Sequence, residues 1–246
     1  QPKVQLLIRH PDEVFVERAE DERPIPRTDW TEMYLDPTGK TLSDTPMAEA
    51  QSFTYEAMGD GATFLTAPME QETEITGPVA AKLFISSETE DADLFLVLRA
   101  FKPDLKEVVY KGANDPHTPV GLGWLRASHR KLDPDQTLPY RPYHAHDEVQ
   151  PLTPGEIYEL DIEIWPTSIV LPEGYRLGLS VRGRDYVYPG WTPGDPMIAN
   201  RVQYGVGPFK HEMPSNRPLD VYGKKVTLHT GPDHPSHVLL PVIPEK

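Results

Sequence analysis

Two segments in the second half of the chain alternate apolar and polar residues with a period of two. In residues 158–165 and 175–182, every other side chain is apolar. Successive side chains of a β-strand point to opposite faces, so this pattern indicates strands with one buried and one solvated side. No window sustains an amphipathic helical stripe over three turns. The sequence therefore predicts an all-β fold.

Further strands are expected on both sides of these segments. Residues 79–86 and 94–101 are largely apolar on both faces, as in the central strands of a sandwich. Edge or peripheral strands are expected at residues 30–35, 52–57, 62–67, 107–110, 225–230 and 237–243. Short strands separated by turn residues favour an antiparallel β-sandwich.

The remaining segments are irregular. Residues 17–27 combine charges with two prolines and are typical of a linker, while the short extended pieces before them suggest the end of a preceding domain. Two long connections, residues 111–150 and 183–224, contain five and six prolines. Connections of this length usually carry function or cover a partner surface.

Charge and composition exclude several classes of protein. The 246 residues carry a net charge of −14, which disfavours binding to nucleic acid. No apolar run approaches the roughly 20 residues of a membrane-spanning helix, and no signal peptide is expected. The chain has no cysteine, which excludes a disulfide framework, a cysteine zinc site and a thiol nucleophile. The absence fits a reducing compartment, and we expect a cytoplasmic protein.

One cluster of histidines resembles a metal site. On a strand, His144, His146 and Glu148 would share one face and could bind a divalent metal. Cupin metalloenzymes, however, place the Glu later and a Gly upstream, where this chain has Leu138. We therefore favour a polar loop or interface rim whose histidines bond to backbone carbonyls, and expect no metal and no cofactor. A metal-dependent β-sandwich enzyme with these histidines as ligands stays an alternative function.

Catalytic and acidic motifs are weak. None of the nine serines lies in a G-x-S-x-G elbow, and Ser128 and His129, being adjacent, would point to opposite faces of a strand. Asp91 and Asp93 belong to an acidic segment that we interpret as a solvated β-turn rather than a calcium site. Tyr186 and the aromatic residues of the long connections could stack on sugars, but packing against protein is the simpler expectation.

Several strings, taken in order, resemble the C-terminal jelly-roll domain of cocaine-esterase-like (CocE/NonD) hydrolases, which the X-Pro dipeptidyl-peptidases share. They are residues 75–79 (ITGPV), 83–87 (LFISS), 91–95 (DADLF), 123–130 (GWLRASHR), 152–156 (LTPGE), 165–168 (WPTS), 174–177 (GYRL) and 236–241 (SHVLLP). The resemblance extends over roughly residues 30 to 243. Residues 1–17 look like the last strand region of that family's α/β-hydrolase domain.

The resemblance implies a galactose-binding-like jelly-roll over residues 30–246, preceded by a domain remnant and linker over residues 1–29. It implies a non-catalytic domain of a serine hydrolase of esters, acyl groups or X-Pro peptides. The catalytic triad of this family belongs to the α/β-hydrolase domain, so no catalytic residue is expected here. That domain is the expected partner, with homo-oligomer contacts but no nucleic acid or membrane. An independent carbohydrate- or ligand-binding module is the alternative.

The long connections are the surface expected to face the hydrolase domain and to form one wall of its active-site region, since proline lowers the ordering cost of a loop. The candidate residues of this face are Trp124, His129, His144, His146, Tyr188 and Trp191.

Overall fold

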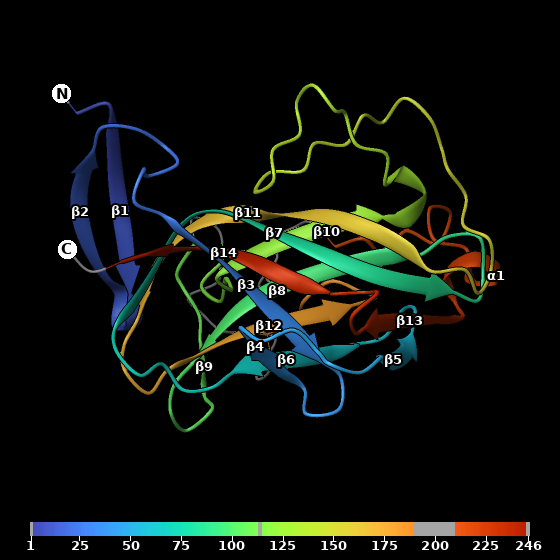
Figure 1. Cartoon of the computed structure of the whole chain (residues 1–246), viewed down its shortest axis with the longest axis horizontal. Helices are drawn as coiled ribbons and strands as arrows, with labels where there is room; N and C mark the ends of the chain where they lie inside the picture. Colours follow the sequence, from blue (N-terminus) through green and yellow to red (C-terminus); the bar gives the residue numbers. More distant parts are fainter. Residues whose placement is uncertain (1, 113–114, 189–209, 245–246) are drawn as a thin grey trace.

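The computed structural model describes residues 2–112, 115–188 and 210–244, and in these ranges the protein is built almost entirely of strands (Figure 1). The strands are β1 (Val4–His10), β2 (Val14–Glu20), β3 (Asp29–Asp36), β4 (Thr41–Ser43), β5 (Gln51–Glu56), β6 (Ala62–Thr66), β7 (Thr73–Ser87), β8 (Asp93–Phe101), β9 (Glu107–Val108), β10 (Gly121–Arg126), β11 (Tyr158–Leu171), β12 (Arg176–Arg182), β13 (Lys225–Thr230) and β14 (His237–Ile243). Helical structure in the described ranges is limited to α1 (Leu219–Tyr222) and two 3-10 turns, η1 (Pro11–Glu13) and η2 (Ala127–His129).

The strands form one continuous, curled set of hydrogen-bonded neighbours. Their order is β10-β8-β12-β6-β4-β3-β14-β7-β11-β1-β2, with β13 joining β5 to β7 and β9 pairing with β8. Figure 1 shows β3 and β14 crossing in front of β8 and β12, so that the curled sheet makes two layers. The core lies between them and unites fully buried side chains of both layers, among them Leu83, Leu98, Leu160 and Leu179. The predicted all-β sandwich is confirmed.

The alternating and apolar segments take the places that their patterns indicate. β7 lies between β14 and β11, and β8 lies between β10 and β12, so both predicted central strands are central. The pairing is antiparallel except for two short parallel contacts, β1 with β11 and β4 with β6.

The assignment of edge strands was less accurate. β3, β6, β13 and β14 all have neighbours on both sides, so residues 30–35, 62–67, 225–230 and 237–243 do not form edges. These strands are short and keep polar residues on one face, a pattern shared by an edge strand and by an interior strand with one solvated side. Of the predicted edge strands, β5 and β9 do lie at an edge.

The predicted long connection 111–150 contains a strand that the pattern did not reveal. β10 pairs with β8 along its whole length, from Gly121–Leu98 to Arg126–Asp93. A Cβ at Gly123 would stand 2.4 Å from the backbone oxygen of Glu163, so only glycine allows this close approach to β11. Two glycines in six residues conceal the alternation that identifies a strand.

The first two strands form a hairpin that lies against one end of the sandwich, at the left of Figure 1. β1 joins the sheet through a parallel contact between Arg9 and Ile169 of β11. Arg18 of β2 makes an ion pair with Glu74 of β7. The boundary between residues 1–29 and 30–246 stays a prediction.

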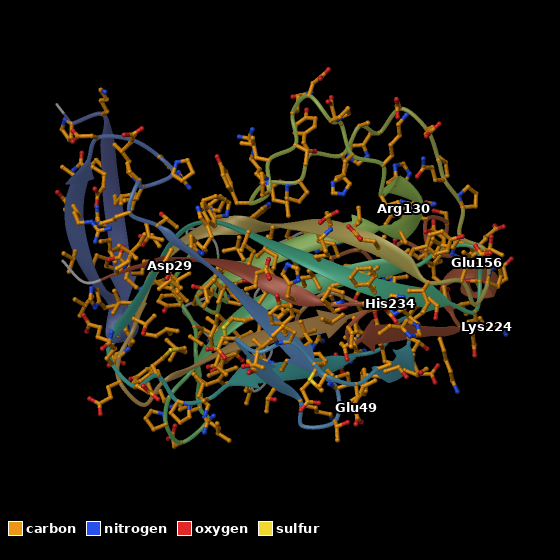
Figure 2. The ribbon with its side chains drawn as sticks, viewed as in Figure 1. Asp29, Glu49, Arg130, Glu156, Lys224 and His234 are labelled. Atoms are coloured by element: carbon orange, nitrogen blue, oxygen red, sulfur yellow. The ribbon has the colours of Figure 1, made fainter. Side chains whose placement is uncertain are left out.

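After η2, residues 130–157 rise as a long loop above β11 before the chain enters that strand; Figure 2 labels Arg130 and Glu156 near its two ends. Backbone hydrogen bonds fix both ends, from Gln150 N to Ser128 O and from Leu152 N to Glu90 O. In the described ranges, no helix is long and apolar enough to cross a membrane.

Candidate functional site

The two long connections meet in one cleft of about 560 Å³, which we call the histidine cleft. The first connection contributes Trp124, Leu125, Arg126, His129, His144 and His146. The second contributes Lys210, His211, Met213, Asn216 and Arg217, and β8 contributes its first three residues, Asp93, Leu94 and Phe95. Four of the six residues selected from the sequence therefore lie together: Trp124, His129, His144 and His146.

Three histidines form one side of this cleft. The Nδ1 atoms of His129 and His146 lie 3.3 Å apart, within hydrogen-bond distance, with the donor set by the tautomers of the two rings. His144 Nε2 lies 3.0 Å from the backbone oxygen of Asp161. Burial, reinforced by the neighbouring imidazoles, lowers the pKa of His144. The interpretation of these histidines as partners of backbone carbonyls is confirmed for His144.

The geometry does not match the strand-borne metal site considered from the sequence. Residues 143–150 are a loop in which His144 makes one isolated bridge to Leu132, and His146 has a φ of 52°. His144 and His146 are consequently not presented on one face of a strand. No group of three or more His, Asp or Glu residues within the described ranges is arranged to hold a metal ion.

Trp124 and Phe95 are the aromatic residues that line the cleft. Trp124 projects from β10 and meets Trp165 of β11 edge to face, with ring centroids 5.1 Å apart. Tyr188 does not line the cleft: it stacks on His117 at 4.5 Å and packs with Trp124 around Val97. Trp191 lies outside the described residues.

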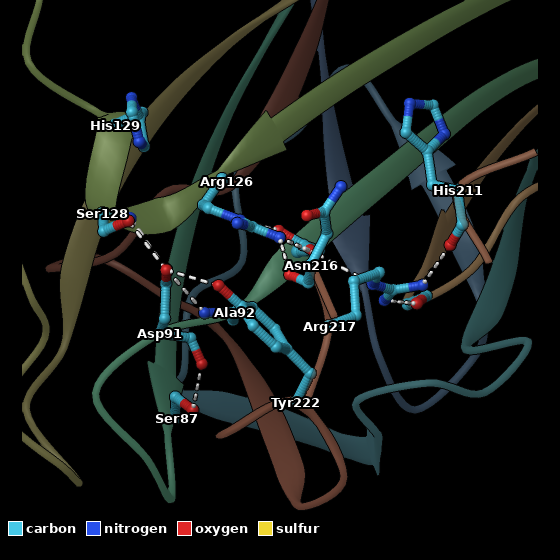
Figure 3. Close-up of polar contacts among 12 residues, drawn as sticks. Ser87, Asp91, Ala92, Arg126, Ser128, His129, His211, Asn216, Arg217 and Tyr222 are labelled. Atoms are coloured by element: carbon cyan, nitrogen blue, oxygen red, sulfur yellow. Dashed lines mark hydrogen bonds and ion pairs between the residues drawn. The ribbon is translucent and has the colours of Figure 1, made fainter. Parts of the chain in front are cut away.

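The floor of the cleft is a buried charge cluster. Arg126 binds the Asp93 carboxylate with two hydrogen bonds, from Nε to Oδ1 at 2.8 Å and from Nη2 to Oδ2 at 2.9 Å. Arg217 donates Nε to the same carboxylate at 2.9 Å and Nη2 to the backbone oxygen of Gly183 at 2.6 Å. The Arg217 side chain is only 5% exposed, so its charge depends on this carboxylate. Figure 3 shows Arg126 and Arg217 beside each other, with Asn216 between them.

Asp91 forms the second half of the cluster. Its carboxylate accepts hydrogen bonds from Ser128 N and Oγ, from Tyr222 Oη and from Ala92 N (Figure 3). Asp91 and Asp93 are 8% and 9% exposed, so the prediction of a solvated turn was wrong for both. The two buried carboxylates are stabilised because each accepts several hydrogen bonds, most of them from residues distant in sequence.

Ser128 is therefore a structural residue. Its hydroxyl donates to Asp91 at 2.7 Å, and no histidine bonds to it. A serine that does contact a histidine ring is Ser86, whose Oγ lies 2.9 Å from His229 Nε2 on the adjacent strand β13. This pair does not line the histidine cleft, and His229 has no hydrogen-bonded carboxylate among the described residues. Both features are required of a triad, so the pair lacks the arrangement for acyl transfer.

The second connection supplies cleft residues that sequence reasoning did not single out. His211 is anchored by Asp185, which receives its backbone N–H and lies 3.0 Å from its Nδ1. Arg217 lies 124 positions from Asp93 in the sequence, and no local pattern connects them. The only sequence signal for this segment was its length and proline content.

Comparison with known proteins identifies the domain. Residues 1–239 match the family model described as the X-Pro dipeptidyl-peptidase C-terminal non-catalytic domain. A putative serine esterase of Mycobacterium bovis is 33% identical over 140 residues, covering 53% of this chain and 20% of that protein. The cocaine esterase of a Rhodococcus species is 25% identical over 282 residues, covering 98% of this chain and 42% of that protein.

Solved structures agree on the fold. A CocE/NonD family hydrolase from Staphylococcus aureus superimposes with a TM-score of 0.85 at 24% identity, over 99% of this chain and 42% of that one. An aminopeptidase from a Thaumarchaeota archaeon gives a TM-score of 0.62 at 15% identity, over 99% of this chain and 41% of that one. The chain thus spans between 20% and 42% of the length of these relatives. Because the family model matches nearly the whole length of this chain, the chain belongs to the family of X-Pro dipeptidyl-peptidase C-terminal non-catalytic domains.

Proposed function

We propose that this domain serves an α/β-hydrolase domain, and that the whole protein is a serine hydrolase of esters or X-Pro amides. The observation that carries the proposal is the match of residues 1–239 to a domain described as non-catalytic. Relatives that contain a similar segment within a longer chain are named as esterases. A cytoplasmic location, based on the absence of cysteine, is part of the same proposal.

The histidine cleft and its rim are the proposed contact face for the hydrolase domain. Apolar side chains are exposed around it, including Tyr143, Val149 and Met213 at 45%, 63% and 61%. Grouped exposed apolar residues with a polar rim are typical of surfaces that bind protein. Because Arg126 and Arg217 are already paired with Asp93, the face is held rigid without a partner. A rigid face orders the partner at a smaller entropic cost.

The domain's proposed contribution is positional. A serine nucleophile needs an activating histidine and a partly dry pocket, and Ser128 is committed to Asp91. In this proposal the domain closes one side of the active-site region while the catalytic groups belong to the hydrolase domain. The names of the relatives, which are esterases, favour this function over the sugar-binding alternative.

The experiment compares the 246-residue chain with a longer chain in which an α/β-hydrolase domain precedes it. We expect the longer chain to hydrolyse activated esters or X-Pro amides and to label with a fluorophosphonate probe, and the 246-residue chain to do neither. Labelling of the shorter chain that is abolished by Ser86→Ala or Ser128→Ala would contradict the proposal.

Hydrogen–deuterium exchange of the two proteins tests the contact face. We expect slower exchange in residues 124–146 and 210–217 of the longer chain, with no change in residues 36–40, a turn on another part of the molecule. Equal exchange at both places would contradict the assignment of this face. Sedimentation of the longer chain tests the expected homo-oligomer.

A further inference from the structure

A second cleft, of about 420 Å³, lies between the hairpin and the sandwich. We call it the Arg9 cleft. Its walls come from five stretches: Val4–Leu7 with Arg9 on β1, Arg23 and Ile25, Thr76 and Gly77 on β7, residues 118–122, and residues 165–168 of β11. No residue is shared with the histidine cleft.

The cleft lies where strands β1 and β11, which pair at one point, diverge from each other. β1 contacts β11 in parallel register at Arg9 and Ile169. On the other side of β11, the register with β7 shifts between Ile164 and Thr167, where Pro166 has no N–H to donate. The first half of β1 is therefore not paired with residues 165–168, and the space between them is open to ligands.

The charge of this cleft is opposite to that of the chain. Its lining contains Arg9 and Arg23 but no Asp or Glu, although the protein carries a net charge of −14. Two other arginines withdrawn from solvent are matched with carboxylates: Arg99 Nη2 lies 2.6 Å from Glu107, and Arg217 Nε lies 2.9 Å from Asp93. The cationic lining is a local exception in an acidic molecule.

Arg9 has a different set of partners. Its Nη2 donates to Thr167 Oγ1 at 2.9 Å and to the backbone oxygen of Val120 at 3.3 Å, and its guanidinium lies 4.5 Å from the ring centre of Tyr110. Among the described residues, no carboxylate bonds to it. Burial lowers the pKa of Arg9, because the surroundings do not compensate for the loss of water around the charge. Its neutral partners fix the direction of the guanidinium and leave Nε and Nη1 without a hydrogen bond to the described residues.

The rest of the lining is suited to a hydrocarbon group. Leu7 and Trp165 are 53% and 57% exposed at the walls, and Leu122 and Ile25 add further apolar surface. Clefts of roughly 300–1,000 Å³ with apolar walls and a few polar groups are typical of sites for small molecules. A guanidinium fork binds a carboxylate through two parallel N–H donors.

We propose that the Arg9 cleft binds a small organic carboxylate with an aromatic or aliphatic body, its carboxylate held by Arg9 and drawn in by Arg23, and its body against Leu7, Leu122 and Trp165. This site does not depend on the proposed hydrolase function. Inorganic phosphate would meet the same arginines but leave the apolar walls unused, so the proposal separates the two anions.

The test titrates the 246-residue chain with sodium phenylacetate, followed by amide chemical shifts and by calorimetry. We expect saturable binding with shifts confined to the amides of residues 4–9, 118–122 and 165–168. Phenylacetamide, which lacks the charge, and inorganic phosphate, which lacks the ring, should each bind about tenfold more weakly or worse. Equal binding of phosphate would overturn the role of the apolar walls, and equal binding of phenylacetamide would overturn that of Arg9.

Three variants give the matched comparison. Arg9→Gln should weaken phenylacetate binding about tenfold, since it removes the charged donor. Arg23→Glu, at an exposed residue with no partner among the described residues, should weaken it about fivefold without affecting folding. Arg141→Gln, at an exposed arginine outside the cleft, should leave binding unchanged.

If Arg9→Gln detaches the hairpin, which its amide spectrum would show, Arg23→Glu carries the test alone. Unchanged affinity in Arg23→Glu would then overturn the proposal. A second copy of the chain could also supply the carboxylate; in that case sedimentation would show a dimer, and dilution would strengthen phenylacetate binding. That outcome would overturn the assignment to a small molecule.

Discussion

Replacing Asp93 by asparagine should destabilise the protein severely, because one carboxylate balances two arginines at the floor of the histidine cleft. Asparagine keeps the shape but removes the charge, and its NH2 group, in place of one carboxylate oxygen, would face a guanidinium N–H that it cannot accept. The Arg217 side chain, 5% exposed, would be left as an uncompensated buried cation. Removal of one partner from a buried ion pair costs about 3–5 kcal/mol. That is a large share of the 5–15 kcal/mol typical for a whole domain.

Urea unfolding followed by tryptophan fluorescence measures the effect. The matched control is Asp147→Asn, which removes an exposed carboxylate, 57% accessible, from Lys131 at 2.9 Å. Exposed pairs contribute about 0–1 kcal/mol, and screening by 1 M NaCl should erase even that difference. The loss in Asp93→Asn should persist in salt, since its partners are withdrawn from the solvent. If the two variants lie within about 1 kcal/mol of each other, the argument that Asp93 balances a buried charge is refuted.

Three further outcomes follow from individual contacts. Ser128→Ala should lower the free energy of unfolding by about 1–3 kcal/mol, because it removes a hydroxyl bonded to a buried carboxylate, whereas the exposed Ser215→Ala should change it by less than about 0.5 kcal/mol; urea unfolding distinguishes them. Gly123→Ala should cost about 1–3 kcal/mol or more, since its Cβ would meet backbone, whereas Gly39→Ala meets only the end of a side chain and should cost less in the same assay. Burial lowers the pKa of His144, so the folded state binds a proton at this residue less readily than the unfolded state does. The free energy of unfolding should therefore fall as the pH drops through about 6.5, the ordinary pKa of histidine. His144→Gln should reduce that loss when urea unfolding is compared at pH 7.5 and 5.5.

The sequence predicted the strands whose side chains alternate and missed those whose pattern glycine interrupts. β11 and β12 follow from residues 158–165 and 175–182, because alternating apolar side chains indicate strands. The expected solvated face is wrong for β12, where Gly178, Ser180 and Arg182 are buried as well. β10 was missed, since the packing of β11 excludes a side chain at Gly123 and leaves little room for one at Gly121. Edge positions were misjudged because the order of strands depends on contacts between distant segments, which hydrophobic periodicity does not encode.

The candidate site was predictable in part. Trp124, His129, His144 and His146 were selected because aromatic and histidine side chains stood out in a proline-rich connection, and they do share a cleft. Their partners on the second connection were not selected. Arg217 resembles any surface arginine until its distance to Asp93 is known. Charged residues are on average exposed, so a prior based on residue type assigns the wrong environment to the few that are buried in pairs.

The acidic turn between β7 and β8 links both long connections to the core. Asp91 holds Ser128 from the first connection and Tyr222 from the end of the second, while Asp93 holds Arg126 and Arg217 in the same way. Ordering one residue costs about 1–2 kcal/mol of backbone entropy. In a sheet, hydrogen bonds between strands offset this cost, whereas a long connection has few such bonds. Charge-assisted bonds to one rigid turn supply that stabilisation at two points of each connection. Because both connections share this anchor, their positions relative to each other are fixed by two adjacent carboxylates, and the shape of the histidine cleft depends on residues that do not face its opening.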